Sequence, residues 1–423
     1  MKLLRKIIIV IMMVGFVTTV KSSPLLLVGY PGQDPDIETL RSALFFPGKE
    51  DYSFARKQFS LKSTFYDLGL VYDINIYMER PDLKYKLWMQ QKPAPMVVIL
   101  PGTGSFYSSS KIIALAELFY SKGYSVLAMS DVFNWQFSES ASSVLMPGYT
   151  PVDSADMYYA LCKIFAALQE KYKDRITDKI LAGFSLGGLH TLFIADMESK
   201  LEGGKIGFDR YLALNPPVDL LYAVKRIDGY FSIGHTLTKK KISESVSKGL
   251  RLYQKVVDKK LDQSSLIDLN KDEARYVIGL DFHMTLVELI YSINSRNKLS
   301  VLHQDYSWFS KENLYKEIDK FNFYSYMALI LKPYYEKAMK CSISMEEINK
   351  ASSLMAIENT LKTNSKIRVI HTSNDFLLNS TQIKWLEDTF GSRVTMLDHG
   401  GHCGYLYFKQ AADVICQKVD PKN

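Results

Sequence analysis

A serine flanked by glycines is the strongest chemical motif in the sequence. Gly183, Ser185 and Gly187 match the pattern G-x-S-x-G, with an apolar stretch that favours a strand before it and a helical pattern after it. A serine on a sharp strand-to-helix turn sits in strained backbone geometry, and neighbours without side chains let the turn close. We therefore predict that Ser185 is a nucleophile. The alternative interpretation is an ordinary glycine-rich turn.

A nucleophilic serine needs a base, and two histidines are well placed for that role. His399 and His402 lie in a loop directly after the last predicted strand. We select His402, because the glycines on both sides of it give the loop freedom to present the imidazole ring. His399 is the competing candidate, whereas His190 and His371 fall inside a predicted helix and a predicted strand.

The histidine in turn needs a carboxylate to orient it, and three aspartates qualify. Asp375 follows the predicted strand 367–371 at the carboxyl edge of the sheet, where α/β enzymes place their sites. Asp219 follows the preceding strand, and Asp398 adjoins the histidine loop but is close to His402 in sequence. We select Asp375 and keep the other two aspartates as alternatives.

Negative charge that develops on a substrate oxygen needs preorganised N–H donors. The Leu186 amide, directly after the serine at the start of a predicted helix, is one candidate. The loop Pro101-Gly102-Thr103-Gly104 follows the first buried strand, and its Thr103 amide is the other. These two amides form the predicted oxyanion hole, and the alternative for the second is a plain Pro-Gly turn.

Short, continuous apolar runs alternate with helical patterns on both sides of these residues. Such alternation indicates a mostly parallel, doubly wound sheet covered on both faces. The stretch 52–88 reads as extended, and alternation over 69–78 adds a strand with one buried face. The other predicted strands are 96–100, 124–129, 179–184, 210–214, 367–371 and 393–397, and the predicted helices are 112–120, 154–172, 186–197, 381–390 and 405–418.

The alternation stops after Pro216-Pro217 and resumes at 367. The residues between are predicted to form helices over 243–259, 271–295 and 311–339, with an optional break at Pro333. Because both ends return to the same sheet, we interpret this segment as a large helical cap inserted late in the sheet. The predicted organisation is a signal segment over 1–22, an N-terminal extended region over 23–93, a core in two parts over 94–217 and 366–423, and the cap over 218–365.

The amino-acid composition indicates a globular protein and argues against a nucleic-acid-binding or disulfide-rich one. Of 423 residues, 47% are hydrophobic and 23% charged, which is typical of a globular chain. The net charge of +7 is spread along the sequence, so we predict no nucleic-acid partner. Four cysteines are too few for a disulfide framework.

The first residues have the pattern of a targeting segment. Lys2, Arg5 and Lys6 precede an apolar run over 7–20, and Val20 and Ser22 fit the small-residue positions before a cleavage site. This arrangement predicts a secretory signal peptide, cleaved after Ser22, and therefore a periplasmic or secreted protein. The alternative is an uncleaved N-terminal anchor, which would associate the protein transiently with a membrane.

The ordered set Ser185, Asp375 and His402, with the serine turn and the Pro101 loop, resembles the α/β-hydrolase superfamily. The resemblance covers 94–216 and 367–416, and the loop around His402 is similar to the G-G-H-x-G loop of many members. One position departs from the family pattern, because Pro101 stands where many members have histidine before the oxyanion glycine. The resemblance implies the α/β-hydrolase fold and a catalytic triad of these three residues, but no particular substrate.

The sequence therefore predicts an exported serine hydrolase that needs no cofactor and cleaves a carboxylic ester through an acyl-enzyme on Ser185. The aromatic-rich cap predicts an apolar pocket and a small or medium acyl substrate. A serine peptidase on the same residues is the nearest alternative, and a catalytically idle binding protein of this fold is an alternative from another class. A metal site at Asp398, His399 and His402 is the least favoured interpretation.

Overall fold

In the part of the chain that the structure describes, eight strands form one sheet in the order β1-β2-β4-β3-β5-β6-β7-β8. β2 is antiparallel to both of its neighbours, and the remaining pairs, from β4 to β8, are parallel. The predicted, mostly parallel sheet is therefore confirmed. The strands are Leu70–Ile74 (β1), Leu83–Trp88 (β2), Ala94–Leu100 (β3), Ser125–Met129 (β4), Ile176–Phe184 (β5), Arg210–Leu214 (β6), Ile367–Thr372 (β7) and Val394–Leu397 (β8).

The structure is a computed structural model. It describes residues 23–44, 65–258, 261, 264–303 and 311–422. The predicted signal segment, 1–22, and part of the stretch predicted to be extended, 52–88, lie outside these residues.

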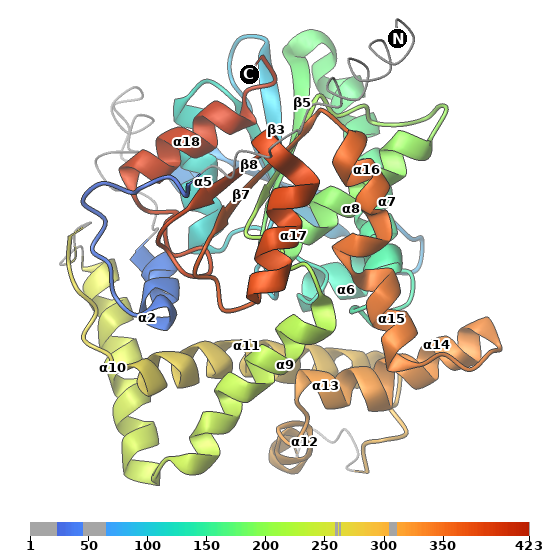
Figure 1. The fold of residues 1–423 in the computed structure, drawn as a ribbon. Coiled ribbons are helices and arrows are strands. Elements are labelled where there is room, and N and C mark those ends of the chain that lie inside the picture. The colour runs from blue at the N-terminus through green and yellow to red at the C-terminus, as the bar shows by residue number, and fades with distance from the viewer. Residues whose placement is uncertain (1–22, 45–64, 259–260, 262–263, 304–310, 423) are drawn as a thin grey trace, which may run out of the picture.

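Helices cover both faces of the sheet (Figure 1): α5 (Ser110–Ser121) and α18 (Lys409–Val419) lie on one face, and α7 (Thr150–Tyr172), α8 (Leu186–Lys200) and α17 (Ser380–Phe390) lie on the other. Alternate residues of β3 point to the two faces. Val97 and Ile99 pack in the core under α5 and α18, whereas Met96 and Val98 pack in the core under α7 and α8. Because β3 is buried on both faces, its sequence is a continuous apolar run.

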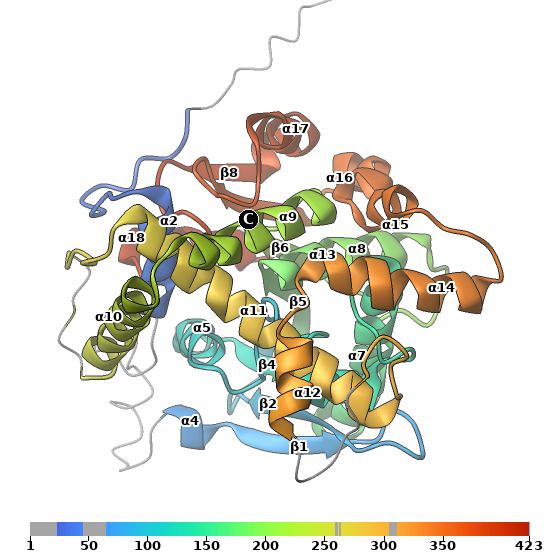
Figure 2. The same ribbon diagram turned by 90° about the horizontal axis from the view of Figure 1, so that it is seen from below.

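The chain between β6 and β7 is helical, and most of it lies beneath the carboxyl edge of the sheet, as Figures 1 and 2 show. In Figure 2, α11 crosses under the strands with α9 beside it. The helices are α9 (Leu220–Ser232), α10 (Lys239–Val257), α11 (Lys271–Arg296), α12 (Lys311–Ile318), α13 (Phe323–Tyr326), α14 (Lys332–Met339), α15 (Met345–Ser352) and α16 (Glu358–Thr363).

The long helix predicted over 311–339 is divided in the structure. α12 ends at Ile318, and Asn322 caps α13 by accepting a hydrogen bond from the Ser325 amide at 2.8 Å. A π-helical turn, Met327–Leu331, then joins α13 to α14, with Pro333 in the first turn of α14. The residues before Pro333 keep right-handed helical geometry through the π-helical turn, so the proline does not end the helix. The break instead follows from an asparagine cap, which the apolar periodicity did not reveal.

Residues 25–44 form an N-terminal arm, within a region that the sequence analysis treated as extended. Leu25 pairs with Leu397 at the edge of β8, and the short helix α2 (Pro35–Leu40) follows. Asp34 caps α2 by accepting the Asp36 amide at 3.0 Å, with a proline at the first helical position. Six residues are too few to show a helical period, so the pattern did not predict this helix. α2 packs against α11.

α11 is long and apolar enough, by length and composition, to cross a membrane, and it is the one such helix among the described residues. Of its most apolar 18-residue window, 56% is buried inside the protein. The core helix of a globular protein passes the same test.

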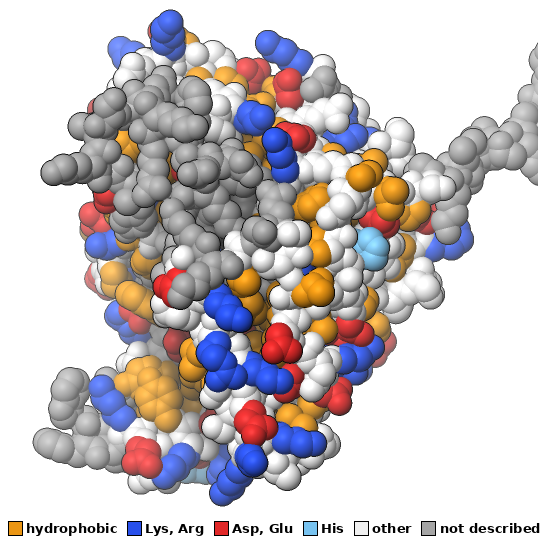
Figure 3. Space-filling view, turned by 90° about the vertical axis from the view of Figure 1, so that its left-hand side faces the viewer, with side chains coloured by type: hydrophobic (Ala, Val, Ile, Leu, Met, Phe, Trp, Pro, Cys, Tyr) orange, Lys and Arg blue, Asp and Glu red, His pale blue; other side chains and the backbone are white. Residues whose placement is uncertain are grey.

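Charged side chains of both signs share the face of the molecule seen in Figure 3. Lysine and arginine lie next to aspartate and glutamate, with hydrophobic side chains between them. On this face, the positive net charge of the chain is therefore not gathered into one patch.

Candidate active site

The turn after β5 places Ser185 at the carboxyl edge of the sheet, directly before α8. Its φ of 55° lies in the left-handed region, which a serine adopts only when its surroundings hold it there. Two glycines let this turn form. A Cβ on Gly183 would lie 2.1 Å from the Gly187 carbonyl oxygen, and a Cβ on Gly187 would lie 2.2 Å from the Leu100 carbonyl oxygen. The turn is therefore packed against the end of β3.

Ser185, His402 and Asp375 form a continuous chain of hydrogen bonds. The Ser185 Oγ and the His402 Nε2 are 2.8 Å apart, and the His402 Nδ1 and the Asp375 Oδ2 are also 2.8 Å apart. These side chains follow β5, β8 and β7, because parallel strands bring their carboxyl ends to one edge of the sheet. Asp375 is 3% exposed and the other two residues are 7% exposed, so the chain is shielded from bulk water.

The surroundings of Asp375 keep its carboxylate ionised. Burial tends to raise its pKa, but the neighbouring imidazoles of His402 and His371 lower it. The hydrogen bonds from His402 and from the Leu377 amide, at 2.9 Å from Oδ1, also lower it, and the net pKa is about 2. Burial lowers the pKa of His371, whose Nε2 lies 3.7 Å from the Asp375 Oδ2. At neutral pH, Asp375 can therefore orient His402 and stabilise its protonated form.

Asn215 is a further partner of Asp375 that the sequence analysis did not select. It follows β6, is fully buried and has a left-handed φ of 45°, a conformation that asparagine tolerates well. Its Nδ2 donates to the Asp375 Oδ2 at 2.7 Å and to the Thr372 Oγ1 at 3.2 Å. Its place after a buried strand and before Pro216 was the signal that could have identified it.

The competing acids and bases have other partners. Asp219 caps α9, with Oδ1 2.7 Å from a backbone amide of the first turn. Asp398 accepts a backbone amide of the N-terminal arm at 3.0 Å. The His399 Nδ1 lies 3.0 Å from the Glu38 Oε1 of α2. His190 is fully buried, and burial lowers its pKa to about 3. The structure thus brings Asp375 and His402, but not these alternatives, into line with Ser185.

Thr103 and Leu186, the residues whose amides are the predicted oxyanion donors, line the same pocket as Ser185. Thr103 belongs to the loop after β3, and Leu186 is the first residue of α8. Amides of a first helical turn have no carbonyl partner within the helix, which makes the Leu186 N–H a candidate donor to a ligand. A Cβ on Gly102 would lie 3.2 Å from the Ser185 Cβ, which shows how closely the loop approaches the serine.

The loop that carries Thr103 is supported from two sides. Asp131 accepts the Gly104 amide at 2.8 Å, and the Asn134 Nδ2 donates to the Gly104 carbonyl at 3.0 Å. Burial raises the pKa of Asp131 to about 7. On the other side, a Cβ on Gly104 would lie 2.3 Å from the Thr285 Cγ2 of α11. The loop therefore fits between the sheet and the helices beneath it.

The sheet carries the serine turn after β5, Asp375 after β7 and the histidine loop after β8. The chain has the α/β-hydrolase fold. No protein-family model matches the sequence, and no curated protein matches it.

Several solved structures are similar to this chain at low sequence identity. An esterase from Pyrococcus furiosus has a TM-score of 0.43 and 14% identity, over 85% of this chain and 95% of that chain. An acylaminoacyl peptidase from Pyrococcus horikoshii has a TM-score of 0.44 and 10% identity, over 83% of this chain and 40% of that chain. Mouse α/β hydrolase domain-containing protein 10 has a TM-score of 0.37 and 14% identity, over 82% and 96%.

The sheet and the helices beneath it line a pocket next to Ser185. Among the described residues, no charged side chain lines it. The hydroxyl of Tyr326 donates to the Pro147 carbonyl at 2.8 Å, so its polar group is already paired. The lining is otherwise mostly apolar and includes Phe133, Leu220, Ala223, Val224, Ile227, Phe282, Phe323, Met327 and Leu377.

Metal-ligating side chains and thiols are two further kinds of reactive group to locate. No cluster of three or more metal-ligating side chains occurs within the described ranges. All four cysteines are free thiols. Cys403 adjoins His402, but burial raises the pKa of its thiol and disfavours the thiolate that would act as a nucleophile.

Proposed function

We propose that the protein is a serine hydrolase that cleaves carboxylic esters with an apolar acyl group. One observation carries this proposal: the hydrogen-bonded chain of Ser185, His402 and Asp375 borders a pocket with a mostly apolar, uncharged lining. Acyl transfer to serine requires a nucleophile, a base and an orienting carboxylate in line. An apolar acyl group requires a lining of this kind.

In the proposed reaction, His402 takes the proton of Ser185 as the Oγ attacks the ester carbonyl carbon. Asp375 orients the imidazole and stabilises its protonated form. The amides of Thr103 and Leu186 donate to the oxyanion as charge develops on it. The alcohol leaves with the proton from His402, and a water activated by the same imidazole then releases the acid from the serine. These steps need no cofactor.

The pocket favours an ester with an apolar acyl group over a peptide. A peptide buries backbone N–H and C=O groups, and these cost free energy unless they are paired. Apart from Ser185, the polar side chains of the lining are Thr103 and Tyr326, and the Tyr326 hydroxyl already donates to a backbone carbonyl. An alkyl or aryl acyl group makes no such demand and gains free energy from leaving water.

A fluorophosphonate probe tests this proposal directly, because it reacts with an activated serine. We expect mass spectrometry to find the label on Ser185, and we expect the protein to hydrolyse p-nitrophenyl esters. Ser185→Ala should lower kcat/KM for these esters by about 10⁴-fold or more. Retention of activity by Ser185→Ala would overturn the mechanism.

The chain offers a matched control for this experiment. The Ser154 Oγ and the His190 Nδ1 are 2.8 Å apart, so this buried pair resembles the Ser185–His402 pair, but neither residue lines the pocket. Ser154→Ala should keep its labelling and its ester hydrolysis. A folded wild-type protein that is neither labelled nor hydrolytic would favour the idle binding protein. Faster turnover of acylated peptides than of every ester would favour the peptidase.

A further inference from the structure

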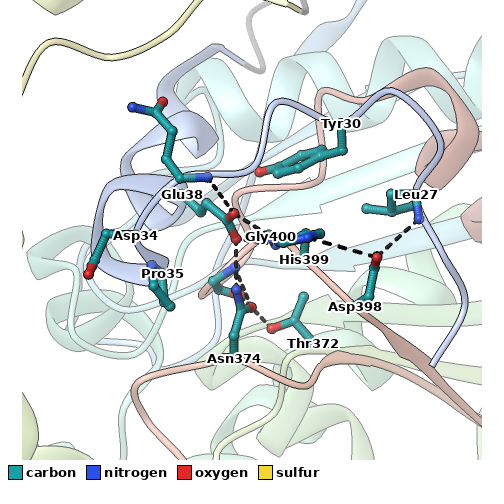
Figure 4. A network of polar contacts seen from close by, with 12 residues as sticks. Leu27, Tyr30, Asp34, Pro35, Glu38, Thr372, Asn374, Asp398, His399 and Gly400 are labelled. Atoms are coloured by element: carbon teal, nitrogen blue, oxygen red, sulfur yellow. Dashed lines mark hydrogen bonds and ion pairs between the residues drawn. The ribbon is translucent and has the colours of Figure 1, made fainter. Parts of the chain in front are cut away.

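One buried carboxylate in the N-terminal arm collects hydrogen bonds from the loops of the proposed active site (Figure 4). Glu38 of α2 is fully buried. Its Oε2 accepts the Gly400 amide at 2.8 Å and the Asn374 Nδ2 at 2.7 Å. Its Oε1 accepts the Gln33 amide at 2.9 Å and lies 3.0 Å from the His399 Nδ1. Glu38 therefore joins the loop after β7 to the loop after β8.

These contacts lie next to the two side chains that act on Ser185. Asn374 directly precedes Asp375, and its Oδ1 accepts the Gly401 amide at 2.9 Å. The Thr39 Oγ1, on the same short helix as the buried carboxylate, accepts the amide of His402 itself at 2.9 Å. The backbone of the histidine loop is thus hydrogen-bonded to α2 at His402 and just before it.

The backbone of α2 also packs directly against the backbone of the histidine loop. A Cβ on Gly401 would lie 2.3 Å from the Pro35 carbonyl oxygen, and a Cβ on Gly404 would lie 1.8 Å from the Glu38 carbonyl oxygen. Real Cβ atoms do not approach backbone atoms so closely. The glycines around His402 therefore do more than loosen the loop, because they let α2 pack against its backbone.

The network requires a carboxylate at position 38. Three of the four groups around Glu38 are N–H donors that accept nothing, and His399 completes the set by donating from Nδ1. A glutamine at this position would turn an NH₂ group towards two of these groups. It would lose at least one hydrogen bond, because a backbone N–H cannot accept, whereas the His399 Nδ1 can accept in its other tautomer.

We propose that α2 positions the base and the acid of the active site, with Glu38 and Thr39 as positioning residues for His402 and Asp375. This inference rests on the proposed function, since positioning matters only if Ser185 reacts. The histidine loop has left-handed glycines at 400 and 401, so without external contacts its backbone would have wide freedom. A displacement of about 1 Å is enough to cost about 100-fold in rate.

A second acidic residue of α2 faces a different partner and provides a matched control. The Asp36 Oδ2 accepts the Arg275 Nε of α11 at 2.7 Å, and its Oδ1 accepts the Tyr230 hydroxyl of α9. Asp36 is also buried, but its carboxylate binds the helices beneath the sheet and not the histidine loop. Asp36→Asn therefore weakens the hydrogen bonds between α2 and the helices α9 and α11, and leaves the contacts of α2 to the histidine loop in place.

The experiment compares Glu38→Gln, Thr39→Val and Asp36→Asn with the wild type. We measure the rate of fluorophosphonate labelling, kcat and KM for p-nitrophenyl acetate, and the melting temperature. For Glu38→Gln, we expect labelling and kcat to fall together by about 10- to 100-fold, with KM within about twofold of wild type. Thr39→Val should show a smaller fall in the same two rates. Asp36→Asn should label at the wild-type rate.

The outcomes separate this inference from the proposed function. If the wild type is not labelled, the proposed function fails and this inference fails with it. If the wild type is labelled and folded Glu38→Gln is labelled equally fast, only this inference fails. An equal loss of labelling in Asp36→Asn would point to general loosening and would also overturn it. If Glu38→Gln does not fold, Thr39→Val decides, and a wild-type labelling rate in that variant would overturn the inference.

Discussion

The serine turn and the histidine loop both depend on glycines, but different parts of the molecule require them. At the serine turn, Gly187 faces the backbone at the end of β3, in the middle of the sheet. At the histidine loop, Gly401 and Gly404 face α2, near the opposite end of the chain. The serine turn is therefore shaped by its own motif and a neighbouring strand. The histidine loop, in contrast, packs against α2, which lies far from the loop in the sequence and is not part of its glycine motif.

The largest expected effect is at the serine turn. In Gly187→Ala the new Cβ would meet the carbonyl oxygens of Leu100 and Pro101 at 2.2 and 2.4 Å, and neither can move without disturbing the central strand. We expect a loss of about 3 kcal/mol or more in the free energy of unfolding, from overpacking. Urea unfolding followed by circular dichroism would measure it. A variant with wild-type stability would show that the turn can move away from β3.

The same change at the histidine loop should have a different result. In Gly404→Ala the new Cβ would meet the Glu38 carbonyl oxygen at 1.8 Å and the Gly400 carbonyl oxygen at 2.5 Å. Both atoms lie outside the sheet, so α2 and the loop can shift while the sheet stays intact. We expect a folded protein in which fluorophosphonate labelling of Ser185 is slower by about 100-fold, because His402 is displaced. Circular dichroism and the labelling rate measured on one sample would test this. If Gly404→Ala failed to fold, the claim that the two glycines have different roles would be contradicted.

A smaller effect should appear in acid. The folded pKa of Asp375, about 2, lies below its usual value of 3.8, so its pairing contributes stability above about pH 4 that is lost as the pH falls through about 2. The shift corresponds to a contribution on the order of 2 kcal/mol. The serine turn has no acid of this kind, so this sensitivity belongs to the histidine side of the site.

Urea midpoints measured between pH 6 and pH 2 would test the acid effect, with Asp375→Asn as the control. The wild type should lose more stability than Asp375→Asn over this range, because the variant has no carboxylate to protonate. Parallel pH curves for the two proteins would contradict the assignment of this stability to Asp375.

Much of the sheet could be predicted because its central strands are buried on both faces. The predicted strand 210–214 matches β6, and the run 96–100 lies within β3. The helices beneath the sheet were harder, since the break after α12 depends on the Asn322 cap and not on a change in periodicity. α2 was not predicted, because one and a half turns do not display a repeating apolar face.

The candidate site, like the fold, has residues that the local sequence indicates and residues that only distant contacts identify. Ser185 is marked by a local motif whose glycines are explained by nearby backbone atoms. The choice between Asp375, Asp219 and Asp398 was open in the sequence, and their hydrogen-bond partners in the structure distinguish them. Glu38 gave no signal, because a glutamate in a short polar segment has the composition of an exposed turn.

By itself, the sequence determined the alternation of strands and helices, the strained serine turn and the set of acids and histidines that follow later strands. These features are local, because they depend on periodicity and on steric limits between near neighbours. Only the tertiary structure decided which acid reaches His402, how α9, α11 and α13 close an apolar pocket over Ser185, and why α2 lies against the histidine loop. Those outcomes depend on hydrogen bonds and packing between segments far apart in the chain, which one sequence does not pair.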